Sequence, residues 1–181
     1  MRNYQWERSL KALWAYTSIS GPISARYHPG EAYPPATALI LPDPTATYSQ
    51  FGIWEVAPNV RAGIEVMVTR SLFECVSVVI PVRMFANVTV APDDPGLHAL
   101  EKLLYDLALY LYQTTTFDIA AIGIDRGCQL LTEFIIDSEA RDAFVREGNF
   151  LAGDDMLGAI RLEPRNYKEV MPALRWCPPN R

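Results

Sequence analysis

The residues of this chain that could carry nucleophilic or acid–base chemistry are few and far apart in the sequence. Apart from the carboxylates, they are His28, His98, Cys75, Cys128 and Cys177. A cysteine nucleophile needs a partly exposed, electropositive setting and a base nearby. Cys128 follows Arg126 in a predicted turn, so it is the best candidate for a small hydrolase. A buried, inactive thiol is the simpler interpretation.

No spacing in the sequence predicts a metal ion or an organic cofactor. The histidines lie 70 residues apart, and no paired cysteines and no carboxylate at a metal-ligand spacing accompany them. The acidic pairs Asp93-Asp94 and Asp154-Asp155 fall where helix caps and turns are expected, so capping explains them better than cation binding. Asp125 and Glu133 could act as acid and base, but outward-facing positions on a sheet explain them equally well.

Catalytic sequence motifs are also missing, since the chain has no glycine-rich phosphate loop, GxSxG elbow, HExxH or DxDxG pattern. We therefore expect a protein that is not an enzyme and that needs neither a cofactor nor a metal. The alternative is a hydrolase that uses Cys128 or an acidic pair.

Charge and composition argue against nucleic acid as a partner. The 181 residues carry a formal net charge of −5, with 16 basic and 21 acidic side chains. A phosphate-backbone binder needs clustered Lys and Arg. The best local cluster is Arg161, Arg165, Lys168 and Arg175, which a solvated surface explains. A hydrophobic fraction of 50% at this length predicts a single globular domain over residues 1–181.

The cysteine number and the N-terminus predict the compartment. An odd number of distant cysteines is typical of a reducing environment, and Glu7 interrupts the segment where a signal peptide would be apolar. The apolar stretches are too short, or too often interrupted by charge, to span a membrane. We expect a soluble cytoplasmic protein without a membrane partner, or a virion component if the protein is viral.

Hydrophobic periodicity predicts the elements that must position these residues. An amphipathic helix over 4–17 places Trp6 and Trp14 on one face and ends at Gly21-Pro22, where a loop begins that runs to Pro35. Further elements are expected as strands over 36–41, 48–56, 61–69 and 73–90, a helix over 95–113, a hairpin of 118–124 and 129–136, a helix over 137–147, a strand over 159–162 and a helical turn over 167–171. This order predicts the α+β class, with an antiparallel meander, a second hairpin and helices mainly on one face, as a two-layer sandwich.

The helix expected over 95–113 is the most informative element, because it is apolar almost all round. Leucines follow a 3-4-3-4 spacing along it, and tyrosines and further leucines fill most of the remaining surface. Such a helix is either enclosed by its own chain, for instance by the helix over 4–17, or covered by another subunit. The candidate interface residues are Leu97, Leu100, Leu104, Tyr105, Leu107, Leu109, Leu111 and Tyr112, together with Trp6 and Trp14.

These features favour assembly over chemistry. We expect a structural protein that self-associates as a homo-oligomer or docks a second protein through the apolar helix and its sheet edges. A tail or neck subunit of a phage virion is the most specific hypothesis, by analogy with small α+β subunits that build rings. A small adaptor, such as a secretion chaperone or a toxin-neutralising immunity protein, is the alternative.

Overall fold

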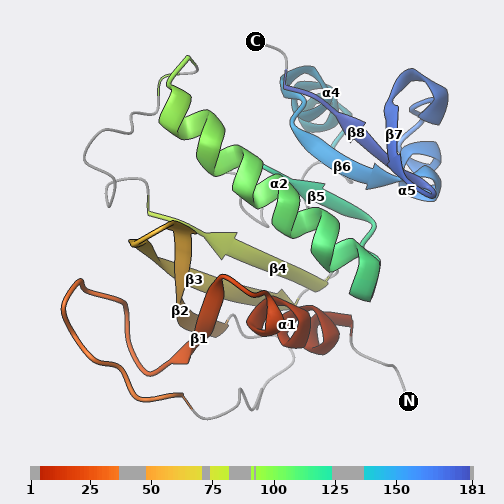
Figure 1. Ribbon diagram of the computed structural model, residues 1–181. Helices are drawn as coiled ribbons and strands as arrows, with labels where there is room; N and C mark the ends of the chain where they lie inside the picture. Colours follow the sequence, from red (N-terminus) through yellow and green to blue (C-terminus); the bar gives the residue numbers. More distant parts are fainter. Residues whose placement is uncertain are drawn as a thin grey trace. The chain divides into compact units, whose positions relative to one another are not determined.

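The computed structural model describes residues 5–36, 48–70, 74–81, 91, 93–123 and 137–179. The chain divides into two compact units, Met1–Leu103 and Leu104–Arg181. Within the described residues, the strands form two antiparallel sheets of four strands each, and helices accompany them (Figure 1). The α+β class is therefore confirmed. The boundary between the two units falls inside a continuous helix. The single domain expected over 1–181 stays a prediction.

The first unit is a helix followed by a meander. It contains α1 (Gln5–Ala15), β1 (Ile19–Ile23), β2 (Tyr48–Ala57), β3 (Val60–Arg70) and β4 (Glu74–Val79), and the strands lie in the order β1-β2-β3-β4. The predicted helix over 4–17, the strands over 48–56 and 61–69 and the meander are confirmed. The strand predicted over 36–41 lies outside the described residues except for Ala36, and only 74–81 is described of the strand predicted over 73–90.

The core of this unit follows the two-residue period of its strands. Ala62, Ile64, Val66 and Val68 of β3 are buried on one face, beside Trp54 of β2. These β-branched and aromatic side chains suit a pleated, half-buried surface. On the opposite face of β3, Glu65, Met67 and Thr69 are half-buried, so this part of the sheet has one buried face and one that is partly open.

Trp14 of α1 packs against this sheet at two glycines. A Cβ atom on Gly52 would lie 2.6 Å from Cζ3 of Trp14, and one on Gly21 would lie 2.5 Å from it. Only glycine leaves room for the indole there. The indole Nε1 donates a hydrogen bond to Oε1 of Gln50 at 3.2 Å, which gives the half-buried ring its polar partner.

The loop expected from Gly21 onward is wrong at its start, because β1 continues through Gly21 and Pro22. Ile19 pairs with Trp54, and the register shifts between Ser20 and Ile23. Proline cannot donate to a strand ladder, but an outer strand with a bulge tolerates it. The Gly-Pro signal therefore marks an irregular edge strand in this chain.

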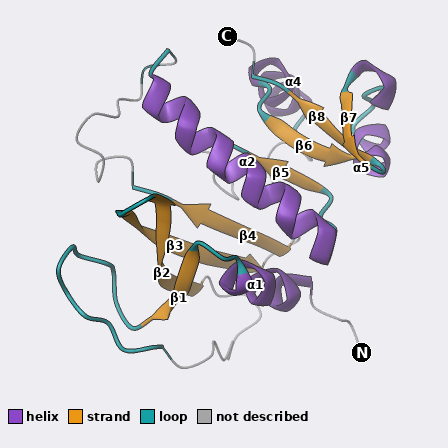
Figure 2. Cartoon of the chain, viewed as in Figure 1, coloured by secondary structure: helices purple, strands orange, loops and turns teal. Residues whose placement is uncertain are grey.

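Helix α2 (Pro95–Thr115) is the long helix expected from the leucine spacing, and Figure 2 shows it as one unbroken element. The carboxylate of Asp94 caps it by accepting hydrogen bonds from the backbone N–H groups of Gly96 at 2.7 Å and Leu97 at 3.3 Å. Pro95 occupies the first turn, where its missing N–H costs nothing. The predicted start is confirmed, and the helix runs two residues beyond Gln113.

Within its described residues, the second unit contains a small sheet with three short helical elements. Its strands β5 (Ile119–Ala121), β6 (Phe150–Gly153), β7 (Lys168–Met171) and β8 (Leu174–Cys177) lie in the order β5-β6-β8-β7. The helical elements are α4 (Ser138–Glu147), α5 (Asp154–Ala159) and the 3-10 helix η2 (Pro164–Asn166). The second strand of the hairpin predicted over 118–124 and 129–136 lies outside the described residues, and β5 pairs with β6.

The helix predicted over 137–147 is confirmed as α4. Asp137 caps it through a hydrogen bond from the backbone N–H of Glu139 at 2.8 Å, and Gly148 ends it with a positive φ of 66°. Two side chains of the same unit, Phe144 and Phe150, pack in its core with their ring centroids 4.9 Å apart and their planes tilted by 35°.

Both predictions for the tail are wrong. The strand expected over 159–162 is the end of α5 and the turn after it, and the helical turn expected over 167–171 is instead the strand β7. The sequence of β7, KEVM, has helix-forming residues, but its pairing with β8 overrides that local preference.

Candidate functional site

The predicted interface residues of α2 fall into two groups by burial. Leu97, Leu100 and Leu107 are buried, with 6%, 7% and 2% of their surfaces exposed. Leu104, Tyr105, Leu109, Leu111 and Tyr112 are half-buried. A buried side chain fits a core position, whereas a half-buried side chain keeps accessible surface that a partner can still cover.

One stripe of α2 packs on the sheet of the second unit. Ala108 joins Ile122, Leu151 and Leu174 in a buried cluster. Leu104, Tyr105, Leu109 and Tyr112 are among the half-buried side chains around that cluster. Tyr105 meets Trp176 edge to face at 4.8 Å between ring centroids, and Tyr112 meets Phe117 at 5.2 Å. The chain itself therefore covers much of this stripe.

A second stripe of α2 is equally apolar. At about 100° per residue, Leu100, Leu103, Leu107, Tyr110 and Leu111 lie next to the first stripe, and the two together span roughly 260° of the circumference. Leu100 and Leu107 are buried, but Leu103, Tyr110 and Leu111 are half-buried. Asp106 and Gln113 lie in the polar strip that remains. The candidate interface expected from the sequence does not include Leu103 and Tyr110. Their helical spacing from Leu107 is the signal that places them on this stripe.

The aromatic residues of α1 are less accessible than the predicted interface requires. Trp6 is buried at 7% exposure, and Trp14 is half-buried against the two glycines of its own sheet. Both side chains belong to the packing of the first unit. Their role in an interface between molecules stays a prediction.

The outer strand β4 offers a sheet edge. It pairs with β3 on one side, and it ends the strand order of its sheet within the described residues. Glu74 is its one charged residue, whereas natural edge strands are commonly protected by charges or by proline. Val79 is 39% exposed, and it and Val60 are the exposed large apolar side chains of the described residues.

The histidines and cysteines do not form a site in the part of the chain that the structure describes. His28 is exposed in a loop, where its backbone N–H donates a hydrogen bond to Oη of Tyr33 at 2.6 Å. His98 is half-buried in the first turn of α2. Cys128, like Asp125 and Glu133, lies outside the described residues, so its proposed use by a hydrolase stays untested. No group of three or more His, Cys, Asp or Glu side chains that could hold a metal occurs among the described residues.

The two described cysteines are in different states. Cys75 is disulfide-bonded, whereas Cys177 is free and buried, and burial raises the pKa of its thiol. A raised pKa disfavours the thiolate, so Cys177 is a poor nucleophile. Disulfide bonds persist mainly in oxidising environments, and the reducing compartment expected from the sequence stays a prediction.

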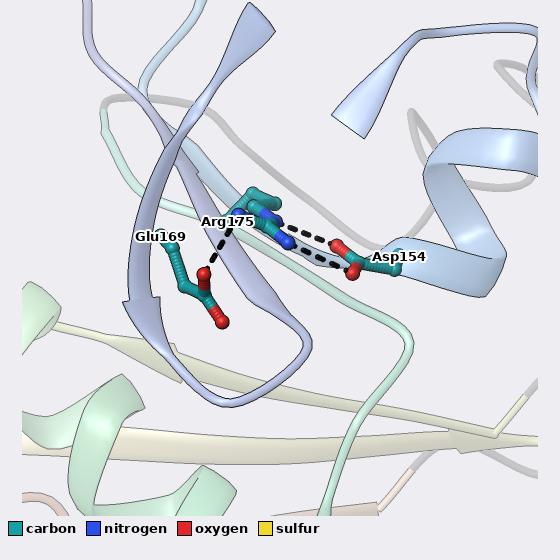
Figure 3. Close-up of polar contacts among 3 residues, drawn as sticks. All are labelled: Asp154, Glu169 and Arg175. Atoms are coloured by element: carbon teal, nitrogen blue, oxygen red, sulfur yellow. Dashed lines mark hydrogen bonds and ion pairs between the residues drawn. The ribbon is translucent and has the colours of Figure 1, made fainter. Parts of the chain in front are cut away.

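The acidic pairs serve the local structure. Asp94 caps α2, and Asp154, in the first turn of α5, binds Arg175 of β8 through two hydrogen bonds of 2.7 and 3.0 Å (Figure 3). The guanidinium also donates to Glu169 of β7 at 3.1 Å. The hydrogen bonds from Arg175 lower the pKa of the Asp154 carboxyl, so it stays ionised. Arg175 thus holds together the start of α5 and two strands, and it is not a free cation for a polyanion.

No protein-family model, curated protein or solved structure matches the chain. Among the described residues, no helix is both long enough and apolar enough to cross a membrane. The geometry of the residues themselves therefore carries the functional argument.

Proposed function

We propose that this protein is a non-enzymatic assembly protein that binds a second copy of itself through the second stripe of α2. The observation that carries the proposal is the row of Leu103, Tyr110 and Leu111, which keep accessible surface beside the buried Leu107. Tyrosine is enriched at protein interfaces, and leucine at the margin of a buried core adds apolar area that a partner can cover. The edge of β4 offers a further surface of contact.

The type of assembly separates the finer alternatives. A closed ring or an open polymer arises from head-to-tail contacts between different surfaces, as α2 on one copy and β4 on another would provide. Such a species would support a virion subunit. A monomer that binds a different protein through the same stripe would support the adaptor.

A substitution in the second stripe tests the proposal. Leu111→Asp places a charge on the half-buried surface, so we expect a folded protein that forms a smaller species than the wild type does. Light scattering coupled to size-exclusion chromatography measures the mass, and circular dichroism measures the folding.

Two variants on the same helix serve as controls. Leu107→Asp buries a charge at a site that is 2% exposed and should unfold the chain, whereas Gln113→Asp in the exposed polar strip should change neither mass nor folding. The proposal fails if the wild type is monomeric across the concentration range. It also fails if the Leu111→Asp protein has the same mass as the Gln113→Asp protein, or if Leu111→Asp merely unfolds the chain.

A further inference from the structure

An open pocket of about 370 Å³ lies on the second unit, between α4 and the turn that follows α5. Arg141, Val145 and Arg146 line it from α4, and Ile160, Arg161 and Leu162 line it from the turn. The volume is at the lower end of the range of small-molecule sites. Three of its seven lining residues are arginines, so the lining is rich in positively charged side chains.

The backbone at Arg161 is in a conformation that disfavours any residue with a Cβ atom. Its φ is 63°, in the left-handed region. The N–H of Arg161 donates to the carbonyl of Gly158 at 3.0 Å, and the N–H of Leu162 donates to that of Leu157 at 2.8 Å. This pair of bonds is the Schellman ending of α5, in which glycine usually occupies the position of Arg161.

An arginine at a glycine position costs folding free energy, and such positions concentrate at functional sites. The hydrogen bonds of the turn use only backbone atoms of Arg161, so the turn itself does not require the side chain. Its presence at the wall of the pocket points to a role for the guanidinium group there.

The acidic side chain at the pocket forms only a weak ion pair with Arg141. Asp142 also lines the pocket, and its Oδ1 lies 3.7 Å from Nε of Arg141. The Asp142 side chain is 70% exposed. Ion pairs that are long and open to solvent contribute little, so a bound dianion can compete with this one.

The floor of the pocket is apolar and firmly packed. Ile160 is buried in a core cluster, and Leu162 packs against the same cluster. Val145 is half-buried on α4. A ligand that fits the whole pocket therefore combines a negative head with a small apolar body.

We propose that this pocket binds a small organic phosphate monoester. The phosphate group lies among Arg141, Arg146 and Arg161, whose planar forks match its oxygens in geometry. Its charge of about −1.5 to −2 at neutral pH is opposite in sign to the arginines of the lining. The organic part lies against Val145, Ile160 and Leu162.

Calorimetric titration at low salt tests the ligand class with three probes. Phenyl phosphate should bind at least about tenfold more tightly than inorganic phosphate, because only the former uses the apolar floor. Phenol should bind more weakly than either probe, since it lacks the charge. Equal affinities for phenyl phosphate and inorganic phosphate would mean that the floor is not a binding surface, and would overturn the proposal.

Arg161→Gly tests the site itself and has a readout that a structural arginine would not give. We expect phenyl phosphate to bind about tenfold more weakly or worse, while the urea midpoint of unfolding rises because glycine suits the left-handed turn. Arg161→Lys keeps the positive charge but lacks the planar guanidinium group. Its affinity for phenyl phosphate should lie between that of the wild type and that of Arg161→Gly.

The matched control is Arg165→Ala. It also removes one positive charge nearby in the sequence, but its side chain is 82% exposed in η2 and is not part of the pocket. It should change the affinity for phenyl phosphate less than twofold. If both variants weaken binding equally, the effect is general electrostatics and the site does not exist. If Arg161→Gly is stabilised with unchanged affinity, the arginine has no part in binding.

Discussion

At the scale of single residues, this chain uses its charged groups to fasten short elements. Arg175 joins α5, β7 and β8 through Asp154 and Glu169 (Figure 3), and its side chain is only 19% exposed. A guanidinium group that donates two parallel hydrogen bonds to one carboxylate is geometrically more specific than an ion pair with a single contact. In a unit built from strands of three or four residues, such a contact defines which strand ends meet.

This network predicts a pH dependence of stability. The folded-state pKa of Asp154 lies below its ordinary value, so its ionised form stabilises the fold above pH about 4, and this contribution is lost as the pH falls through the folded pKa. In urea unfolding, Asp154→Asn should therefore be less stable than the wild type at pH 6 to 8, with a difference that shrinks below pH 4. Asp155→Asn, on the exposed neighbour, should lack this pattern. A difference that stays constant down to pH 2 would contradict the assignment.

At the scale of elements, the apolar surfaces that matter are the second stripe of α2 and the edge of β4. The edge is the simpler of the two to test, because the described residues supply a matched pair of exposed valines. Val79 ends β4, whereas Val60 begins β3 at the turn from β2. The two side chains are 39% and 44% exposed.

Val79→Lys should weaken self-association at least several-fold, because a charge on an edge strand opposes pairing with another strand. Val60→Lys should leave association unchanged, since it adds the same charge away from that edge. Sedimentation over a concentration series measures both. If the two variants behave alike, pairing through β4 is not part of the assembly.

The sequence predicts the long periodic elements well and the short ones poorly. Eleven-residue β3 alternates clearly, and the leucine spacing after Asp94-Pro95 defines α2 with its cap. The four-residue strands β6, β7 and β8 are too short for a period to show, and their existence depends on pairing between segments separated in sequence.

The candidate sites show the same division. The leucine stripes of α2 follow from helical spacing alone, including the positions of Leu103 and Tyr110. The arginine pocket does not, because it needs the turn at Arg161 to meet a face of α4. The sequence around Arg161 does not predict a left-handed backbone there. The nearby glycine, Gly158, lies inside the last turn of α5, three residues before the position with the positive φ.

At the scale of the whole molecule, the central feature is that α2 belongs to both compact units. The boundary lies between Leu103 and Leu104, in the middle of a helix that runs from Pro95 to Thr115. Neither unit contains the whole helix. A backbone hydrogen bond inside a helix is stable only while the turns on both sides of it persist. Unfolding of one unit should therefore propagate through α2 into the other unit.

We therefore expect one cooperative thermal transition, in which the calorimetric and van't Hoff enthalpies agree. Differential scanning calorimetry at neutral pH measures both. This outcome would support the single domain predicted from the chain length. Two separated transitions, or a van't Hoff enthalpy well below the calorimetric one, would show that the units unfold independently.

The cap at Asp94 has a practical consequence for dividing the chain. A fragment that starts at Leu104 would follow the boundary between the compact units, yet it would begin in the middle of α2. The first backbone N–H groups of its helix would then have no capping side chain to accept their hydrogen bonds. A fragment that starts at Asp93 keeps the carboxylate and every turn after it. The boundary between the two compact units is thus the wrong place to divide the chain, and a better place lies upstream, before the helix begins.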